Sequence, residues 1–280
     1  MGQLGEAHVR DAAPRTRGPR LARAVAAPPE GTAVGGVVLV LPGGGPAPGD
    51  TGLPLSPLPY LRSYARYARM RPLARSLAAA GAAEGLVVHV VRYGRPTGGT
   101  GPDAPHVTDA VPHVADAEWA VNEVVRRYGD VPVCLAGHGT GGRAALRAAG
   151  HQAVNSVLAM APCLPAAEDR QDAEPVRQLV GRQVLIMHGT NDAHTDPRLS
   201  FRLAERAKKA NRDTCRFEVH SDGHALRQHH AEVLALASDF MLGALLSRTY
   251  SRPVADALAA PPPLGLRMPL AAGFGRSLRP

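Results

Sequence analysis

Short apolar runs alternate with helical patterns along the middle of this sequence, and this alternation constrains the fold more than any other feature. The runs that predict strands lie at about residues 37–41, 86–91, 131–136, 154–160, 183–187 and 215–219. The patterns that predict helices lie at about residues 60–80, 109 or 116 to 128, 143–149, 197–210 and 226–247. Alternation of this kind is typical of βαβ units, and continuously apolar strands are buried on both faces. We therefore predict an α/β fold, with a mostly parallel central sheet of about seven strands and helices on both faces.

The two ends of the chain differ in composition from this middle part. Residues 1–34 mix Arg, Ala, Pro and Gly without a helical or strand period, and residues 250–280 are rich in proline. Such composition favours disorder or loose packing. We expect an N-terminal disordered tail at 1–34, one domain at 35–249 and a C-terminal tail at 250–280. Only some 20 residues separate the strand that ends near Met160 from the next one, so no large cap domain is expected.

The formal net charge of +8 and the pI of about 10.0 raise the question of nucleic-acid binding. Residues 1–30 carry a net charge of +2 and residues 251–280 carry +3, so the 220 residues between them hold only +3. Aromatic residues, on which bases stack, make up 4% of the chain. Nearly all the basic charge is arginine, which is typical of a GC-rich genome. We expect no nucleic-acid partner.

Cysteine usage and apolar run length bear on where the protein works. The three cysteines, Cys134, Cys163 and Cys215, have no metal-ligand spacing and cannot all pair. We interpret them as reduced thiols of a cytoplasmic protein, with Cys134 as a buried small residue and a reactive thiol at Cys163 as a minor alternative. No apolar run approaches the roughly 18 residues of a membrane span.

No phosphate-binding glycine motif or trusted metal spacing occurs, so we expect neither cofactor nor metal. The expected partner is a small-molecule substrate or ligand, and nothing in the sequence bears on the oligomeric state.

The segment from Val131 to Leu146 carries the most specific motif of the chain. It reads VPVCLAGHGTGGRAAL, which predicts a strand, a tight turn and a helix in the pattern G-x-S-x-G of a nucleophile elbow. Glycines flank the apex of such a turn because the neighbouring Cβ atoms would clash, and the apex residue has a strained backbone. Gly137 and Gly141 occupy the flanking positions. Gly139 occupies the apex, where the nucleophile usually stands.

On these residues the chain resembles small α/β-hydrolases of the dienelactone-hydrolase-like type common among actinobacteria, over about residues 36–247. In that fold the acid and the histidine follow the nucleophile in this order. The resemblance assigns Asp192, in HGTND, as the acid and His224, in SDGH, as the histidine. It also implies an oxyanion hole formed by the backbone N–H groups of Thr140 and of Gly44 or Gly45.

The chain departs from that family at Gly139, because a glycine cannot form a covalent acyl-enzyme. Thr140 is a poor substitute, since the residue after the apex lends its N–H group and points its side chain away. Three functions therefore compete. The first is hydrolysis of a small ester or related carbonyl compound by water that His224 activates. The second is non-hydrolytic base catalysis by His224 and Asp192, and the third is a catalytically inactive pseudohydrolase that binds a ligand or partner.

Nearby polar residues have simpler interpretations. Asp196 precedes Pro197 and is expected to cap the helix that this proline opens. Asp222 is expected to be a turn residue. His138 is expected to pack under the elbow, and His188 to support the loop that holds the acid.

Overall fold

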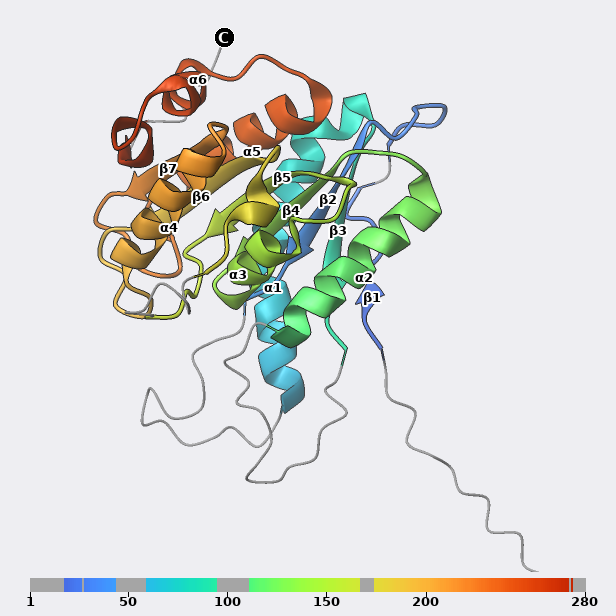
Figure 1. Cartoon of the computed structure of the whole chain (residues 1–280). Helices are drawn as coiled ribbons and strands as arrows, with labels where there is room; N and C mark the ends of the chain where they lie inside the picture. The colour runs from blue at the N-terminus through green and yellow to red at the C-terminus, as the bar shows by residue number, and fades with distance from the viewer. Residues whose placement is uncertain are drawn as a thin grey trace, which may run out of the picture.

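A single eight-stranded sheet forms the centre of the molecule, with the strand order β1-β3-β2-β4-β5-β6-β7-β8 (Figure 1). This computed structural model describes residues 18–26, 28–43, 59–94, 111–166, 174–271 and 273. Strands β2 to β8 pair in parallel, and β1 pairs antiparallel to β3. The strands are β1 (Arg20–Leu21), β2 (Gly36–Leu41), β3 (Leu86–Arg92), β4 (Val133–His138), β5 (Val154–Met160), β6 (Gln183–Gly189), β7 (Thr214–Val219) and β8 (Met268–Leu270).

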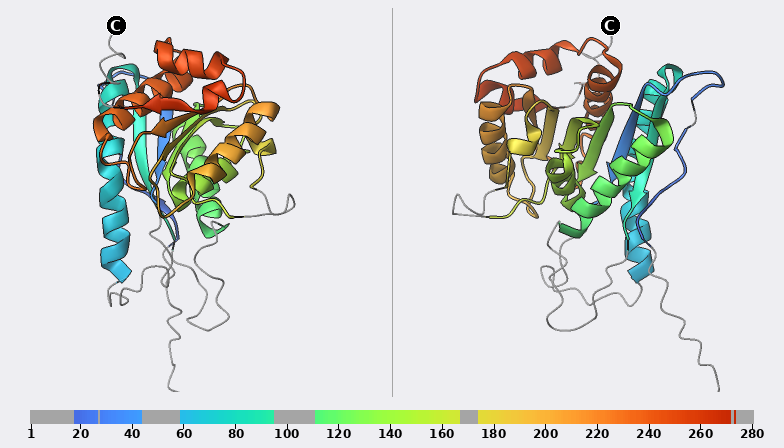
Figure 2. Two further views of the ribbon diagram at one scale, coloured as in Figure 1. Left: turned by 90° about the vertical axis from the view of Figure 1, so that its left-hand side faces the viewer. Right: turned by 45° about the vertical axis from the view of Figure 1, so that its right-hand side comes forward.

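Helices cover both faces of the sheet (Figure 2). Side chains of α1, α5 and α6 pack on one face, and those of α2, α3 and α4 pack on the other. The helices are α1 (Pro59–Gly81), α2 (Val111–Tyr128), α3 (Thr140–Ala148), α4 (Pro197–Ala210), α5 (His230–Leu246) and α6 (Arg252–Ala259), with short 3-10 turns η1 (Ala82–Glu84), η2 (Arg177–Leu179) and η3 (Leu264–Leu266). The predicted fold class is confirmed, and the connection between β5 and β6 is too short for a large cap domain.

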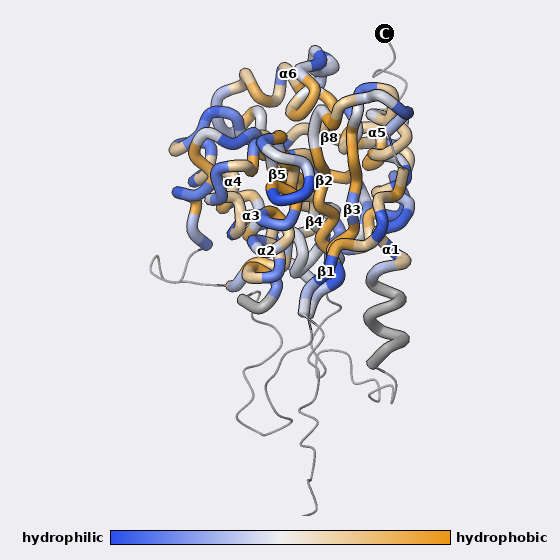
Figure 3. Tube along the Cα trace, turned by 90° about the vertical axis from the view of Figure 1, so that its right-hand side faces the viewer, coloured by the Kyte–Doolittle hydropathy of each residue, from blue (hydrophilic) through white to orange (hydrophobic). Residues whose placement is uncertain are grey.

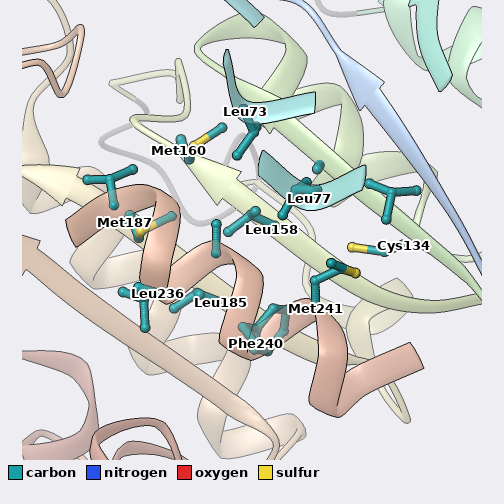
Figure 4. Close-up of a cluster of buried hydrophobic side chains, with 14 of the residues drawn as sticks. Leu73, Leu77, Cys134, Leu158, Met160, Leu185, Met187, Leu236, Phe240 and Met241 are labelled. Atoms are coloured by element: carbon teal, nitrogen blue, oxygen red, sulfur yellow. The ribbon is translucent and has the colours of Figure 1, made fainter. Parts of the chain in front are cut away.

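The face under α1 and α5 holds the core cluster shown in Figure 4. Leu77, Leu158 and Phe240 are fully buried there. Burying a side chain of this size stabilises a fold by about 1.5–3 kcal/mol. Cys134 of β4 lies in the same cluster, and burial raises the pKa of its thiol to about 12. It is therefore a packed residue, as its position in the strand indicated.

The C-terminal part of the chain folds against the domain as far as Leu270, beyond the boundary expected at residue 249. Strand β8 pairs with β7, so that β7 is not an exposed edge. Helix α6 is held at its end by the buried ammonium group of Lys208, which donates hydrogen bonds to the carbonyl oxygens of Ala257 and Leu258 at 3.2 and 2.9 Å. Pro253 stands in the first turn of α6 and Pro261, Pro262 and Pro263 stand in the loop after it, positions that tolerate proline, whereas Pro269 stands in the edge strand β8.

The N-terminal segment also contacts the sheet within the region expected to be a tail. Ala22 and Val25 donate backbone hydrogen bonds to Val90 and Val88 at 3.0 and 2.9 Å. The buried ring of His89 lies 2.8 Å from the carbonyl oxygen of Ala22, measured at Nδ1. Residues 18–26 therefore belong to the folded domain, whereas residues 1–17 lie outside the described residues.

The two aspartates expected to act as a helix cap and a turn residue, Asp196 and Asp222, determine where α4 and α5 begin. Asp196 accepts a hydrogen bond from the N–H group of Arg198 at 2.8 Å, and Pro197 opens α4. Helix α5 begins at His230, four residues later than expected. The reason is that Asp222 accepts backbone hydrogen bonds from Arg227 and His229, at 3.1 and 3.0 Å, and holds the preceding residues in a turn. None of the helices in the described ranges is long and apolar enough to cross a membrane.

Candidate active site

The strand β4, the residue Gly139 and the helix α3 form the tight turn that the sequence predicted. Gly139 has φ 57° and ψ −121°, the mirror image of extended backbone, which side chains of L-residues rarely tolerate. A Cβ atom at Gly137 would collide with the carbonyl group of Gly141, and one at Gly141 with the carbonyl group of Leu41. Both flanking glycines are therefore required by close backbone approach. Only Gly139 separates strand from helix, so the turn is sharper than the six-residue turn expected at 137–142.

Backbone hydrogen bonds fix the apex of this turn from the neighbouring strand. The N–H group of Gly139 donates to the carbonyl oxygen of Met160, at the end of β5, over 2.9 Å. The carbonyl oxygen of Gly139 accepts from the N–H groups of Cys163 and Arg143 at 3.0 and 3.1 Å. Both backbone polar groups of Gly139 are thus hydrogen-bonded, which holds the apex in place.

Asp192, in the loop after β6, is the centre of a hydrogen-bond network. Its Oδ1 atom accepts from the backbone N–H groups of His194 and Thr195 at 2.8 and 3.1 Å. Its Oδ2 atom lies 2.6 Å from Thr195 Oγ1, 2.8 Å from His224 Nδ1 and 3.1 Å from His188 Nε2. Burial alone raises the pKa of this carboxyl group, but the hydrogen bonds from His188, His224 and Thr195 outweigh it and hold the pKa well below its usual range. Asp192 is therefore ionised at neutral pH.

His224 lies in the loop after β7, where it reaches Asp192 across the gap between two strand ends. Because the Asp192 carboxylate accepts a hydrogen bond from Nδ1, the neutral imidazole carries its proton there and leaves a lone pair on Nε2. The His224 side chain is 17% exposed, whereas that of Asp192 is fully buried. The imidazole is therefore accessible to solvent, whereas the carboxylate is not.

His138, the last residue of β4, connects the elbow to the histidine loop. Its Nε2 atom donates to the carbonyl oxygen of His224 at 2.7 Å, and the two rings meet edge to face with centroids 4.7 Å apart. Burial, followed by the nearby His224, lowers the pKa of His138 to about 4. The ring is therefore neutral at pH 7 and holds His224 beside the elbow.

Of the predicted site residues, Asp192 and His224 are joined by a hydrogen bond, and Gly139 directly follows His138, which contacts His224. Thr140 is the first residue of α3, directly after the apex. Gly44 and Gly45 lie outside the described residues. Gly43, which follows β2, lies close to the elbow. A Cβ atom at this position would collide with the carbonyl oxygen of His138.

Thr195 is a member of the network that sequence reasoning missed. Its hydroxyl group donates to Asp192 and lies 3.2 Å from both His224 Nδ1 and His188 Nε2. The sequence signalled only a turn at Asp192, since aspartate side chains commonly accept hydrogen bonds from nearby backbone N–H groups. His188 is fully buried against the same carboxylate, in the supporting position that was expected.

Cys163 lies next to the apex but is poorly suited to serve as a nucleophile. Burial, followed by the charge of Asp192, raises the pKa of its thiol to about 11. Very little thiolate exists at neutral pH under these conditions. Within the described ranges, no group of three or more His, Cys, Asp or Glu side chains is placed to hold a metal ion.

Comparison with solved structures identifies the fold. The chain is similar to an alpha-beta serine hydrolase homologue from Coxiella burnetii, at 14% identity and a TM-score of 0.51 over 80% of this chain and 96% of that one. It is similar to XC6422 from Xanthomonas campestris, a serine hydrolase without a lid, at 16% identity and 0.52 over 80% and 88%. It is also similar to the esterase Pf2001 from Pyrococcus furiosus, at 14% identity and 0.56 over 76% and 82%. The chain therefore has the α/β-hydrolase fold. No protein-family model matches the sequence, and no curated protein matches it.

Proposed function

We propose that this protein hydrolyses a small ester or a related carbonyl compound, with a water molecule activated by His224 in place of a side-chain nucleophile. The observation that carries the proposal is the 2.8 Å hydrogen bond between His224 and ionised Asp192, beside a turn that keeps elbow geometry without a nucleophile. The serine hydrolases and esterases among the similar structures support it at the level of fold. We further propose that the protein is a dienelactone-hydrolase-like enzyme of the actinobacterial kind.

The proposed reaction begins with a water molecule between His224 and the substrate carbonyl group. His224 Nε2 takes a proton from this water as its oxygen attacks the carbonyl carbon. The tetrahedral intermediate then expels the alcohol oxygen, which receives the proton back from His224. The products are a carboxylic acid and an alcohol, and the imidazole is neutral again.

Asp192 serves this reaction through charge. The imidazolium that forms after proton transfer lies against a carboxylate that remains ionised, which stabilises it as in a Ser-His-Asp triad. Thr195 and His188 hold the same carboxylate in place. We assign these two as positioning residues.

The negative charge that develops on the substrate oxygen requires hydrogen-bond donors. Thr140 is the first residue of α3, where the helix dipole concentrates partial positive charge. We propose its N–H group as one donor and that of Gly44 or Gly45 as the other.

The three cysteines are unpaired, which supports our proposal that the protein works in the cytoplasm.

The test measures hydrolysis of short p-nitrophenyl esters by the native chain and by the His224→Ala variant. We expect kcat/KM to fall by about 100-fold or more, the usual contribution of a general base. The control is His220→Ala, which removes an exposed imidazole four residues earlier on the same loop and should leave the rate unchanged. The proposal fails if the native chain shows no turnover above buffer, or if His224→Ala and His220→Ala hydrolyse these esters at the native rate.

A further inference from the structure

A basic pocket opens at the edge of the sheet where the N-terminal segment passes α1. It has a volume of about 220 Å³ and is lined by Arg23, Val25, Tyr67, Arg71, Ala74, Arg75 and Val90. Ala74 and Val90 are buried and form its floor, whereas the three arginines are exposed. In Figure 3 the segments around β1, β3 and α1 lie together at this edge. Strand β2 separates β3 from β4 in the sheet, so the pocket is distinct from the candidate active site.

The walls of this pocket are fixed by the fold. Hydrogen bonds from Ala22 and Val25 to β3 hold the N-terminal wall on one side. On the other side, α1 is anchored to the core by Leu73 and Leu77, which are buried on the same face of the sheet. The pocket is therefore formed by packed elements, and its arginines project from a rigid frame.

The arginines around the pocket have no acidic partner among the described residues. Arg71 and Arg75 are one helical turn apart on α1, a spacing at which like charges repel. Arg92, at the end of β3, places its guanidinium group 4.7 Å from the centre of the Tyr67 ring. Within the described part of the chain, no ion pair joins Arg23, Arg71, Arg75 or Arg92 to a carboxylate, whereas Arg143 and Arg147 both bind Glu174. An anion in the pocket would offset the mutual repulsion of these cations.

We propose that this pocket binds the phosphate group of a small, soluble phosphate monoester. Guanidinium groups match phosphate oxygens in a two-pronged geometry, and a phosphate monoester carries nearly two negative charges that several arginines can share. The pocket is smaller than the roughly 300–1,000 Å³ of sites for drug-sized ligands, which suits a phosphate with a short carbon chain. Val25 and the Tyr67 ring provide the apolar surface against which that chain would lie.

The test compares two double variants that remove the same charge from different helices. Arg71→Gln with Arg75→Gln changes the pocket. Arg198→Gln with Arg202→Gln is the matched control, because these exposed arginines have the same spacing on α4, which covers the opposite face of the sheet. Binding of inorganic phosphate and of glycerol 3-phosphate is measured by calorimetry at constant ionic strength. Thermal unfolding checks that each variant is folded.

We expect one saturable site in the native chain and in the α4 control, and binding at least about tenfold weaker in the pocket variant, since two charge-assisted contacts are lost. The His224→Ala variant should bind phosphate as the native chain does, whether or not the proposed hydrolysis is correct. The proposal is overturned by the absence of saturable binding, by equal losses in both double variants, or by unchanged binding in the pocket variant. Binding that is confined to vesicles of phosphatidic acid also overturns it.

Discussion

Replacing Gly139 with serine tests whether the turn after β4 is a hydrolase elbow that lacks only its nucleophile. Gly139 has φ 57° and ψ −121°, a conformation that glycine adopts freely but that strains other residues by about 1–3 kcal/mol. A residue with a side chain also lowers the entropy of the unfolded chain, which offsets about 0.4–1 kcal/mol. We therefore expect Gly139→Ser to lower the free energy of unfolding by about 1–2 kcal/mol.

Gly139→Ala is the matched control, because it has the same backbone strain and no hydroxyl group. Both variants should lose a similar amount of stability in urea titrations, which corresponds to a fall in Tm of roughly 2–8 °C for a domain of this size. Only Gly139→Ser should gain turnover of p-nitrophenyl esters and react with a fluorophosphonate at residue 139. The native chain should show no labelling at this position.

Two results would refute this reasoning. If Gly139→Ala is as stable as the native chain, the apex does not impose strain and the turn is not an elbow of the hydrolase kind. If Gly139→Ser is folded and strained but gains neither turnover nor labelling, the apex does not direct a hydroxyl group toward His224.

Two further predictions concern stability. Gly137→Ala places a Cβ atom against the backbone of Gly141 and should destabilise the chain by about 3 kcal/mol or more in urea titrations. The control is Gly150→Ala, whose new Cβ atom would lie in ordinary contact, 3.4 Å from Gln178 Cβ, and which should change the unfolding free energy by about 0.5 kcal/mol or less. Equal losses of stability in the two variants would contradict the packing described at the elbow. Because the folded pKa of Asp192 lies below its unfolded value of about 3.9, its stabilising contribution is complete at neutral pH and is lost as the pH falls below about 5. The difference in unfolding free energy between the native chain and Asp192→Asn should therefore stay nearly constant between pH 7 and about pH 5 and narrow as the pH falls from about 4 to about 2. A difference that stays constant down to about pH 2 would show that the ionised carboxylate is not stabilising.

Local patterns were sufficient to predict the parts of this protein that depend on nearby residues. Glycines at 137 and 141 indicated a sharp turn because the steric need for them arises within a few residues of the chain. Asp196 and Pro197 predicted the start of α4 for the same reason. The family resemblance assigned Asp192 and His224, and both residues follow parallel strands, β6 and β7, whose ends meet at one edge of the sheet.

The network around Asp192 could not be read in the same way. His188 was expected to support the acid loop, but its contact with the carboxylate and that of Thr195, at distances of about 3 Å, depend on how the loop after β6 folds. His138 reaches His224 across 86 positions of sequence, and the sequence predicted only that it packs under the turn. Such contacts depend on the relative positions of separate strands.

The sequence by itself determined the α/β class, the order of most strands and helices, and the glycine at the apex of the elbow, because apolar periodicity and steric requirements are local. Only the tertiary structure decided that the segments Arg20–Leu21 and Met268–Leu270 join the sheet. The segments at β1 and β8 are short and rich in arginine, alanine or proline, so they have no strand pattern of their own. Their structure comes from pairing with β3 and β7, whose unpaired edges they cover.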